Sequence, residues 1–283
     1  MIVHLNGHFL PLDEAKISVL DRGFIYGDGV YELVPVYHRQ PFRLPHHLAR
    51  LQHSLDGIRL ANPHTRAEWE ALILELVARQ PFENQGVYLQ VTRGVAKRDH
   101  AFPKDVPQTV FMMSNPLATP TAEQIENGVA VVTADDNRWR HCDLKTISLV
   151  GNVLMRQLAA DSGAIETVMF RDGFLTEASA SNVLIVNEGR IIAPPKDNLI
   201  LPGITYDAAL EFARDAGLPF EVRPVPKAEA MSAAEMWLSS STKEVLAITT
   251  VDGKPFAGGA PGPIFRTMHA LFQQKKPQQG ATG

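Results

Sequence analysis

The sequence predicts a two-domain protein of mixed α/β class, and three observations support this prediction. The chain has 283 residues, 45% of them hydrophobic, which is long for one domain and sufficient for two cores. Strand-like runs occur along it together with longer amphipathic runs typical of helices. Prolines and small polar residues gather at 115–124, as in a linker. We therefore expect a smaller N-terminal α/β domain at 1–117, a linker at 118–122 and a larger C-terminal domain at 123–283.

Charge and cysteine content exclude several classes of partner. Lys and Arg total 27 against 31 acidic residues, a net charge of -4, so no global field attracts nucleic acid or anionic lipid. The one cysteine, Cys142, cannot form an internal disulfide, which fits a reducing compartment. The first residues lack the pattern of a signal peptide, and no run reaches membrane-spanning length. We expect a soluble, cytoplasmic protein in which local groups hold any small anionic ligand.

A hairpin and a glycine-rich loop open the N-terminal half. Residues 2–10 carry an Asn-Gly pair between apolar neighbours, which predicts a β-hairpin. The segment DRGFIYGDGVYELVPVY at 21–37 contains three glycines and then an apolar run typical of a strand. Tyr31 and Glu32 lie where this strand leaves the loop. The glycines fit either a close approach to a ligand or a structural turn.

Two helices are predicted next. Over residues 45–60, apolar side chains recur three and four positions apart: Leu48, Leu51, Leu55 and Ile58. Arg50 lies beside this stripe, where its planar guanidinium could bind a phosphate or lie along the surface. Thr65 and Glu68 form a capping box that predicts the start of a second helix.

A basic loop separates two predicted strands at 87–92 and 109–113. The first strand alternates apolar and polar residues, as a half-buried strand does. It runs into RGVAKRDHAF, whose cationic or potentially cationic residues are Arg93, Lys97, Arg98 and His100. This loop fits either an anion-binding site or a solvated basic turn.

Lys145 is the candidate nucleophile of the second half. It lies in RWRHCDLKTIS at 138–148, after a predicted strand at 129–133 and before an amphipathic helix at 149–160. Burial disfavours a charged amine, and a Schiff-base lysine must lose its proton. The alternative is an ordinary surface lysine.

Three further motifs follow, among strands predicted at 166–170, 183–186 and 191–192. LTEASASN at 175–182 places a carboxylate before small hydroxyl and amide side chains. LPGIT at 201–205 leads into a helix predicted at 206–216, whose N-terminus could bind an anion or simply be capped. A serine-rich loop at 239–242 separates two strands. No spacing of metal ligands is evident.

Together these parts match the requirements of pyridoxal 5'-phosphate: a lysine, a carboxylate, an arginine, a helix N-terminus with threonine and a serine-rich loop. The chain also resembles the fold-type IV pyridoxal-phosphate enzymes, which include D-amino acid aminotransferases, branched-chain aminotransferases and aminodeoxychorismate lyase. The motifs that carry the resemblance are DRGFIYGDGVYE, HLARL, VYLQVTRG, DLKTIS, LTEASASN, LPGIT and SSSTKE. It covers nearly the whole chain and implies a cofactor held between the two domains.

The resemblance implies a role for each site residue. Lys145 would carry the cofactor as a Schiff base and shuttle the proton between substrate and cofactor. Glu177 would bind the pyridine nitrogen and keep it protonated, which makes the ring an electron sink. The phosphate would be held by four residues: Arg50, Ile204, Thr205 and Ser241. Arg138 matches a family position close to the active-site lysine.

The loop at 98–100 points to a substrate. Arg98 and His100 together with Tyr31 resemble the carboxylate trap of D-amino acid aminotransferases, in which the two basic residues come from the neighbouring subunit. This implies a homodimer with its active site at the subunit interface. The activity implied is transamination between D-alanine-like amino acids and 2-oxo acids such as pyruvate or 2-oxoglutarate. Two positions depart from the pattern: Ala180 replaces a frequent serine, and Tyr206 replaces the usual arginine.

Other activities remain open on the sequence. Within the family these are a branched-chain L-amino acid transaminase, an (R)-amine transaminase and aminodeoxychorismate lyase. Outside it, a non-catalytic carrier of pyridoxal phosphate is conceivable, although Lys145 and Glu177 are both present. From their positions, Phe24, Ile25 and Leu33 are expected to shape the side-chain pocket. The composition of residues 273–283 is typical of disorder.

Overall fold

The structure is a computed structural model that describes residues 1–279. It divides into two compact units. The first unit comprises Met1–Leu117 and Leu144–Leu149, and the second comprises Ala118–Asp143 and Val150–Lys276. The segment that carries Lys145 thus groups with the first unit, whereas we expected it in the C-terminal domain. The reason lies in the backbone, because Tyr31 N donates to Lys145 O at 2.9 Å and Ile147 N donates to Gly29 O at 3.1 Å.

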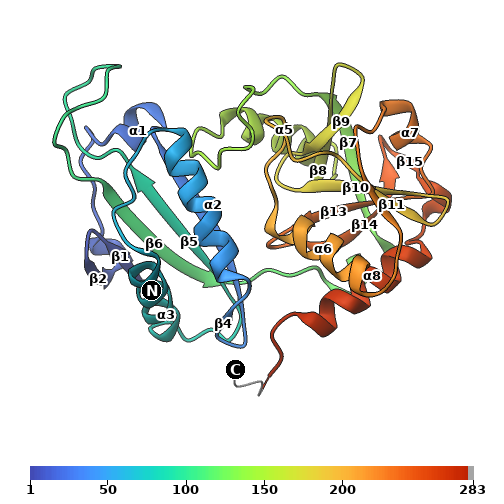
Figure 1. The fold of residues 1–283 in the computed structure, drawn as a ribbon, viewed down its shortest axis with the longest axis horizontal. Helices are drawn as coiled ribbons and strands as arrows, with labels where there is room; N and C mark the ends of the chain where they lie inside the picture. Colours follow the sequence, from blue (N-terminus) through green and yellow to red (C-terminus); the bar gives the residue numbers. More distant parts are fainter. Residues whose placement is uncertain (280–283) are drawn as a thin grey trace. The chain divides into compact units, whose positions relative to one another are not determined.

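An antiparallel sheet of six strands forms the first unit, in the order β2-β1-β6-β5-β3-β4 (Figure 1). Its strands are β1 (Ile2–Leu5), β2 (His8–Pro11), β3 (Gly29–Tyr37), β4 (Gln40–Pro41), β5 (Gln85–Thr92) and β6 (Thr109–Pro116). The predicted hairpin is confirmed as β1 and β2. Leu12–Glu14 add one 3-10 turn, η1.

Two helices cover one face of this sheet. They are α2 (Leu44–Gly57) and α3 (Arg66–Ala78), and both contribute to one hydrophobic core with β3, β5 and β6. The capping box predicted at Thr65 and Glu68 is present at the start of α3. A short helix that we did not predict, α1 (Arg22–Tyr26), occupies the glycine-rich loop and begins at the capping residue Asp21.

A nine-stranded sheet forms the second unit. Its path runs β12-β11-β10-β13-β14-β7-β8-β9, and β15 pairs with β14. The strands are β7 (Val129–Asp135), β8 (Glu166–Arg171), β9 (Phe174–Ala178), β10 (Asn182–Asn187), β11 (Arg190–Ala193), β12 (Phe220–Val222), β13 (Glu235–Ser240), β14 (Glu244–Val251) and β15 (Lys254–Pro255). The pairs β7/β8, β7/β14 and β11/β12 are parallel, and the others are antiparallel.

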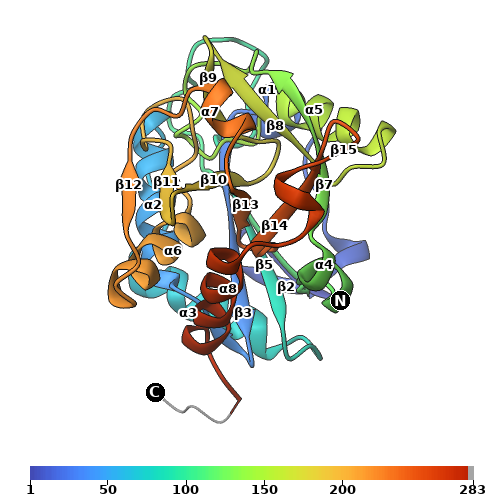
Figure 2. The same cartoon turned by 90° about the vertical axis from the view of Figure 1, so that its right-hand side faces the viewer.

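Five helices and one 3-10 turn accompany this sheet. They are α4 (Ala122–Asn127), α5 (Val150–Asp161), α6 (Ile204–Asp215), α7 (Lys227–Met231), α8 (Pro263–Lys275) and η2 (Ala257–Gly259). Figure 2 shows α6 and α8 beside β13 and β14, and the rings of Phe212 and Phe272 join the two helices at 6.0 Å. None of the helices in residues 1–279 is both long and apolar enough to span a bilayer.

Two expectations need correction. Helix α6 begins at Ile204, two residues before the predicted start, because Gly203 is its N-cap residue and already accepts a hydrogen bond from Asp207 N. The predicted disorder at 273–283 is wrong for residues 273–275, which complete α8 because its apolar face, including Phe272, is buried. Residues 280–283 of that segment lie outside the described residues.

Candidate active site

Lys145 lies against strand β3 in the first unit. Its backbone N donates to Ser54 Oγ of α2 at 3.0 Å, and its carbonyl accepts from Tyr31 N at 2.9 Å. The side chain is half-buried, and Nζ lies 4.2 Å from the centre of the Tyr31 ring. Tyr31 in turn stacks on Tyr88 at 5.6 Å. The structure therefore brings together two of the predicted site residues, the lysine and the phenol.

Arg50 is buried on α2, and the carboxylate of Glu32, to which the sequence analysis gave no role, fixes it. Arg50 Nε and Nη2 donate to the two oxygens of Glu32, at 2.7 and 2.9 Å. His47 Nδ1 lies 2.8 Å from Glu32 Oε2. Burial opposes ionisation of Glu32, but the charge and hydrogen bonds of Arg50 and the bond from His47 outweigh it and hold its pKa well below the usual range. The fork geometry leaves Arg50 charged and rigid.

His47 is the third member of this cluster. Burial lowers the pKa of His47, and the charges of Arg50 and Lys145 add to that effect against the opposing carboxylate of Glu32. His47 Nε2 is buried without a hydrogen-bond partner among the described residues. The i, i+3 spacing of His47 and Arg50 and the position of Glu32 after Tyr31 are the sequence signals that could have identified this cluster.

Arg98 and His100 are exposed on the loop between β5 and β6. Both lie beside Tyr26 of α1: the ring of His100 is 5.4 Å from the Tyr26 ring, and Arg98 Cζ is 5.4 Å from its centre. Arg93, from the same basic run, is buried instead, and its Nε donates to Asp28 at 2.8 Å. Only part of the basic run is therefore available to bind an anion.

Glu177 lies on β9 in the second unit and is buried. Its Oε1 accepts from Arg138 Nη1 at 2.6 Å, and its Oε2 accepts from Leu201 N at 3.0 Å and from Asn182 Nδ2 at 3.2 Å. Burial raises the pKa of Glu177 even though Arg138 and the Leu201 amide act in the opposite direction. A further cationic N–H donor would therefore stabilise this carboxylate. The protonated pyridine nitrogen of pyridoxal phosphate is such a donor, so the residue fits the cofactor.

Arg138 is positioned by Asp136, which sequence reasoning missed. Asp136 accepts from Arg138 Nε at 3.0 Å and Nη2 at 2.9 Å, and also from Arg171 Nη2 at 3.0 Å. Thr176 Oγ1 donates to the same carboxylate at 2.9 Å. The result is a chain of alternating charge, Arg171, Asp136, Arg138 and Glu177, within one unit. An Asp two residues before an Arg is too common a pattern to predict this arrangement.

The start of α6 carries Ile204 and Thr205, both buried. Its N-cap residue, Gly203, provides no side-chain cap, so the amides of the first turn remain suited to an anion. A Cβ at Gly203 would meet Asn182 Oδ1 at 2.0 Å. Asn182 Nδ2 also donates to Leu201 O at 2.9 Å, which connects the Glu177 carboxylate with this helix start.

Ser241 is half-buried in the turn between β13 and β14. Two residues later, Lys243 Nζ lies 2.8 Å from Glu166 Oε1. Glu166 is fully buried and accepts from Ser179 Oγ, from Ser181 Oγ at 2.8 Å and from Ala180 N at 3.1 Å. Glu166 thus joins the serine turn to the loop that carries Ala180, although neither motif indicated it.

Four other predicted positions have different surroundings. Tyr206 is a core residue whose hydroxyl donates to Pro194 O at 2.7 Å, and burial raises its pKa. The replacement of the usual arginine by Tyr206 therefore affects only local packing. Phe24 is 69% exposed, while Ile25 and Leu33 are half-buried. Their expected role in a side-chain pocket stays a prediction.

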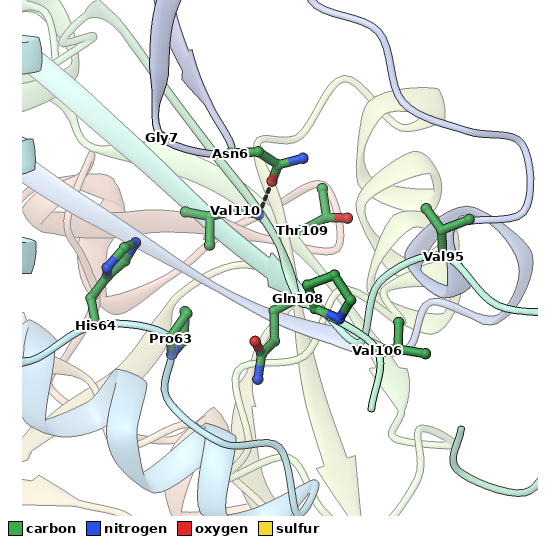
Figure 3. A pocket seen from close by; sticks show the side chains of 10 residues that line it. Asn6, Gly7, Pro63, His64, Val95, Val106, Gln108, Thr109 and Val110 are labelled. Atoms are coloured by element: carbon green, nitrogen blue, oxygen red, sulfur yellow. Dashed lines mark hydrogen bonds between the residues drawn. The ribbon is translucent and has the colours of Figure 1, made fainter. Parts of the chain in front are cut away.

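One hollow in the first unit contains none of the predicted site residues. It has a volume of about 470 Å³ and lies where β6 begins, with Val95, Val106 and His64 among its lining residues. Figure 3 shows Asn6 at its edge, where Asn6 Oδ1 accepts from Val110 N at 2.8 Å. Its lining residues include no lysine, cysteine or carboxylate, and the hydroxyl of Thr109 donates to Asp21, so we assign no chemistry to it.

Comparisons with known proteins give a consistent result. The family model described as amino-transferase class IV matches residues 29–251. The D-alanine aminotransferase of Bacillus licheniformis is 37% identical over 273 residues, which is 96% of each chain. That of Listeria monocytogenes serotype 4b is 36% identical over 277 residues, 97% of this chain and 96% of the relative.

A solved structure shows the same fold. The crystal structure of the T.th. branched-chain amino acid aminotransferase with pyridoxamine 5'-phosphate superimposes with a TM-score of 0.89 and 24% sequence identity. The match covers 96% of this chain and 93% of that one. The two-domain mixed α/β prediction is confirmed by this likeness.

Proposed function

The chain belongs to the class IV amino-transferase family, and from this premise we propose that it transfers amino groups between D-alanine-like amino acids and 2-oxo acids such as pyruvate or 2-oxoglutarate. It is an aminotransferase that uses pyridoxal 5'-phosphate. The observation that carries the substrate proposal is 37% identity to a D-alanine aminotransferase across 96% of each chain. The likeness to the branched-chain enzyme, at 24% identity, concerns the fold alone.

In the first unit we assign Lys145 and Arg50 to the cofactor. Lys145 would form the covalent link through Nζ and would then move the proton to and from the substrate carbon. Its backbone is fixed at both ends of the peptide, by Ser54 Oγ and Tyr31 N, so the side chain starts from a defined position. Arg50 would bind the phosphate through its guanidinium, whose orientation the Glu32 carboxylate fixes.

In the second unit we assign Glu177, Ile204, Thr205 and Ser241. Bound pyridoxal phosphate supplies an electron sink for negative charge at the substrate carbon. Glu177 would keep the pyridine nitrogen protonated, and Arg138 and the Leu201 amide hold its carboxylate in place. The first amides of α6, the Thr205 hydroxyl and the Ser241 hydroxyl would bind phosphate oxygens.

Substrate recognition is assigned to Tyr31, Arg98 and His100. A cationic fork, an imidazole and a phenol can fix a carboxylate on one side, which determines the face of the substrate that receives the proton. We propose that Arg98 and His100 act in the neighbouring subunit of a homodimer. Exposed apolar side chains along one face of α5 support an interface between copies: Val150, Val153, Leu154 and Leu158, at 75%, 60%, 61% and 41% exposure. The buried free thiol of Cys142 supports a reducing, cytoplasmic location.

A half-reaction tests the proposal. The purified yellow protein is mixed separately with D-alanine, L-alanine, L-leucine and (R)-1-phenylethylamine, and the loss of its cofactor absorbance is followed. We expect bleaching with D-alanine and recovery on adding 2-oxoglutarate. Lys145→Ala should abolish bleaching with every amine, which serves as the control for cofactor chemistry. Bleaching by L-leucine alone would instead indicate a branched-chain L-amino acid transaminase, and bleaching by the aryl amine alone would indicate an (R)-amine transaminase.

A further inference from the structure

A buried arginine holds the loop that carries Arg98 and His100. Arg22 Nη1 donates to the carbonyl of Asp99 at 2.6 Å and to the carbonyl of Ala101 at 3.3 Å. These two carbonyls lie on either side of His100. The loop backbone is thus fixed next to an imidazole that is itself exposed.

Asp28 makes Arg22 a rigid support. The Arg22 side chain is 4% exposed, and its Nε donates to Asp28 Oδ2 at 2.7 Å. Arg93 Nε donates to the same oxygen at 2.8 Å, while its Nη2 and Nη1 donate to the carbonyls of Ile58 at 2.7 Å and Arg59 at 3.1 Å. One carboxylate therefore holds two buried guanidiniums, one beneath the loop and one at the end of β5.

Tyr26 contacts the two side chains that the loop presents. Its ring centre lies 5.4 Å from the His100 ring, 5.4 Å from Arg98 Cζ and 4.9 Å from Arg22 Cζ. A cation over an aromatic face is attracted by the ring, so Tyr26 favours the orientation of Arg98 in which the guanidinium lies against that ring. The Tyr26 hydroxyl is buried without a hydrogen-bond partner in residues 1–279. Tyr26 therefore contacts the loop through its ring and not through its hydroxyl.

Helix α1, which carries Arg22 and Tyr26, is itself tied to both strands that border the loop. Asp21 accepts from Gly23 N at 2.8 Å, from Thr92 Oγ1 of β5 at 2.8 Å and from Thr109 Oγ1 of β6 at 2.6 Å. Five residues are too few for a stable isolated helix, so these bonds keep α1 in place. Movement of the loop relative to α1 would break contacts at several separate points.

We propose that Arg22 and Tyr26 are positioning residues for recognition of the substrate carboxylate, with α1 acting as a platform that presents Arg98 and His100 in one arrangement before substrate binds. The proposal rests on the proposed function, because it assigns the carboxylate to Arg98 and His100. A loop ordered in advance loses less conformational entropy when the substrate binds. Neither Arg22 nor Tyr26 needs to touch the substrate.

Kinetics of the half-reaction test this role. Arg22→Lys keeps a positive charge near Asp28 but loses the planar fork that reaches two carbonyls. We expect the D-alanine concentration for half-maximal bleaching to rise, with a loss on the order of 10²-fold in kcat/KM and a smaller change in the maximal rate. Tyr26→Leu should show the same pattern, and Tyr26→Phe should restore most of the parent value. The cofactor absorbance before mixing should stay at the parent level.

Arg39→Lys is the matched control. Arg39 also binds two backbone carbonyls and one carboxylate, those of Val77, Gln80 and Glu83, but it lies outside the loop. Its half-reaction should equal that of the parent. If Arg22→Lys and Tyr26→Leu matched Arg39→Lys in D-alanine dependence, the platform role would be wrong.

Limited trypsin digestion gives a readout independent of activity. Lys97 and Arg98 are exposed cleavage sites within the loop. In holoenzyme, we expect cleavage after these residues to be at least about 10-fold faster in Arg22→Lys than in the parent or in Arg39→Lys, because a released loop opens more often. If the parent does not react with D-alanine but the cleavage rates differ as expected, the proposed function fails and with it the link to the substrate carboxylate, while the ordering of the loop by α1 stands. Equal cleavage rates would overturn the platform.

Discussion

Asp136→Asn tests the charge network that supports Glu177. Asp136 binds two buried guanidiniums, those of Arg138 and Arg171, and Arg138 then binds Glu177 at 2.6 Å. The substitution keeps the shape of the side chain but removes its charge, and places an amide NH₂ where one guanidinium now donates. The second unit is left with two buried cations facing one carboxylate.

The free energy of unfolding that Asp136→Asn loses depends on the hydrogen-bond partners that Arg138 and Arg171 keep. Breaking a buried ion pair by neutralising one partner costs about 3–5 kcal/mol. Arg138 keeps Glu177, and Arg171 keeps the carbonyls of residues 136 and 138 at 3.0 and 2.7 Å. The cost should therefore fall near the lower end, at about 3 kcal/mol.

Urea unfolding of the second unit measures this free energy. The chain has three tryptophans, so a Trp69→Phe background leaves Trp139 and Trp237 as reporters, both in the second unit. Cofactor is removed from both proteins so that binding does not add to the free energy of unfolding. Asp135→Asn is the control, because Asp135 is the exposed neighbour and its loss should change stability by less than about 0.5 kcal/mol.

The direction of the Asp136 pKa shift determines how the loss of stability in Asp136→Asn changes with pH. Burial opposes ionisation of Asp136, but the hydrogen bonds and charge of Arg138 outweigh it and lower its pKa below the ordinary 3.8. A lowered pKa gives stability that is complete above 3.8 and is lost as the pH falls through the folded-state pKa. The difference between parent and variant should therefore be full at neutral pH and shrink in acid. A difference below about 1 kcal/mol at neutral pH, or one equal to that of Asp135→Asn, would refute the reasoning.

Three further substitutions or treatments have defined outcomes. Lys243→Met leaves the buried Glu166 with neutral donors only and should destabilise the second unit by about 2 kcal/mol in urea; the loss should be smaller in a Glu166→Gln background. Glu177→Gln should slow the maximal bleaching rate with D-alanine by at least about 10²-fold in stopped-flow, because the amide cannot keep the ring nitrogen protonated; an unchanged rate would exclude that role. Burial raises the pKa of Cys142 to about 11, so iodoacetamide at pH 8 should alkylate it on the order of 10²-fold more slowly than a free cysteine until urea unfolds the unit; rapid labelling of folded protein would contradict this.

Local signals in the sequence were sufficient for most elements. The alternating residues of the strand at 87–92 predicted the buried face of β5, and Val87, Leu89 and Val91 are fully buried. The capping box at Thr65 predicted the start of α3 because both of its hydrogen bonds form within four residues. Such features depend on periodicity and neighbouring side chains, which the sequence displays directly.

Features that depend on distant residues were not predictable in this way. Helix α1 exists because Asp21 binds Thr92 and Thr109, which are 71 and 88 positions away in the chain. The segment with Lys145 joins the first unit through backbone bonds to β3, a pairing that leaves no mark on side-chain pattern. The roles assigned to the site residues were obtained from a family resemblance, and they stay predictions until the variants are measured.

The basic loop shows most clearly why composition alone could not separate supporting from functional charges. Arg93 and Arg98 are five positions apart, yet Arg93 binds Asp28 and two carbonyls whereas Arg98 is exposed. A buried arginine needs a carboxylate and carbonyl acceptors arranged around it, and for Arg93 these come from two separate segments of the first unit, Asp28 and residues 58–59. Asp28 is already occupied by Arg22 and Arg93, so Arg98 does not depend on that carboxylate. A substrate carboxylate is then a suitable partner for its charge, which is why the exposed Arg98 is a better candidate for binding than the buried Arg93.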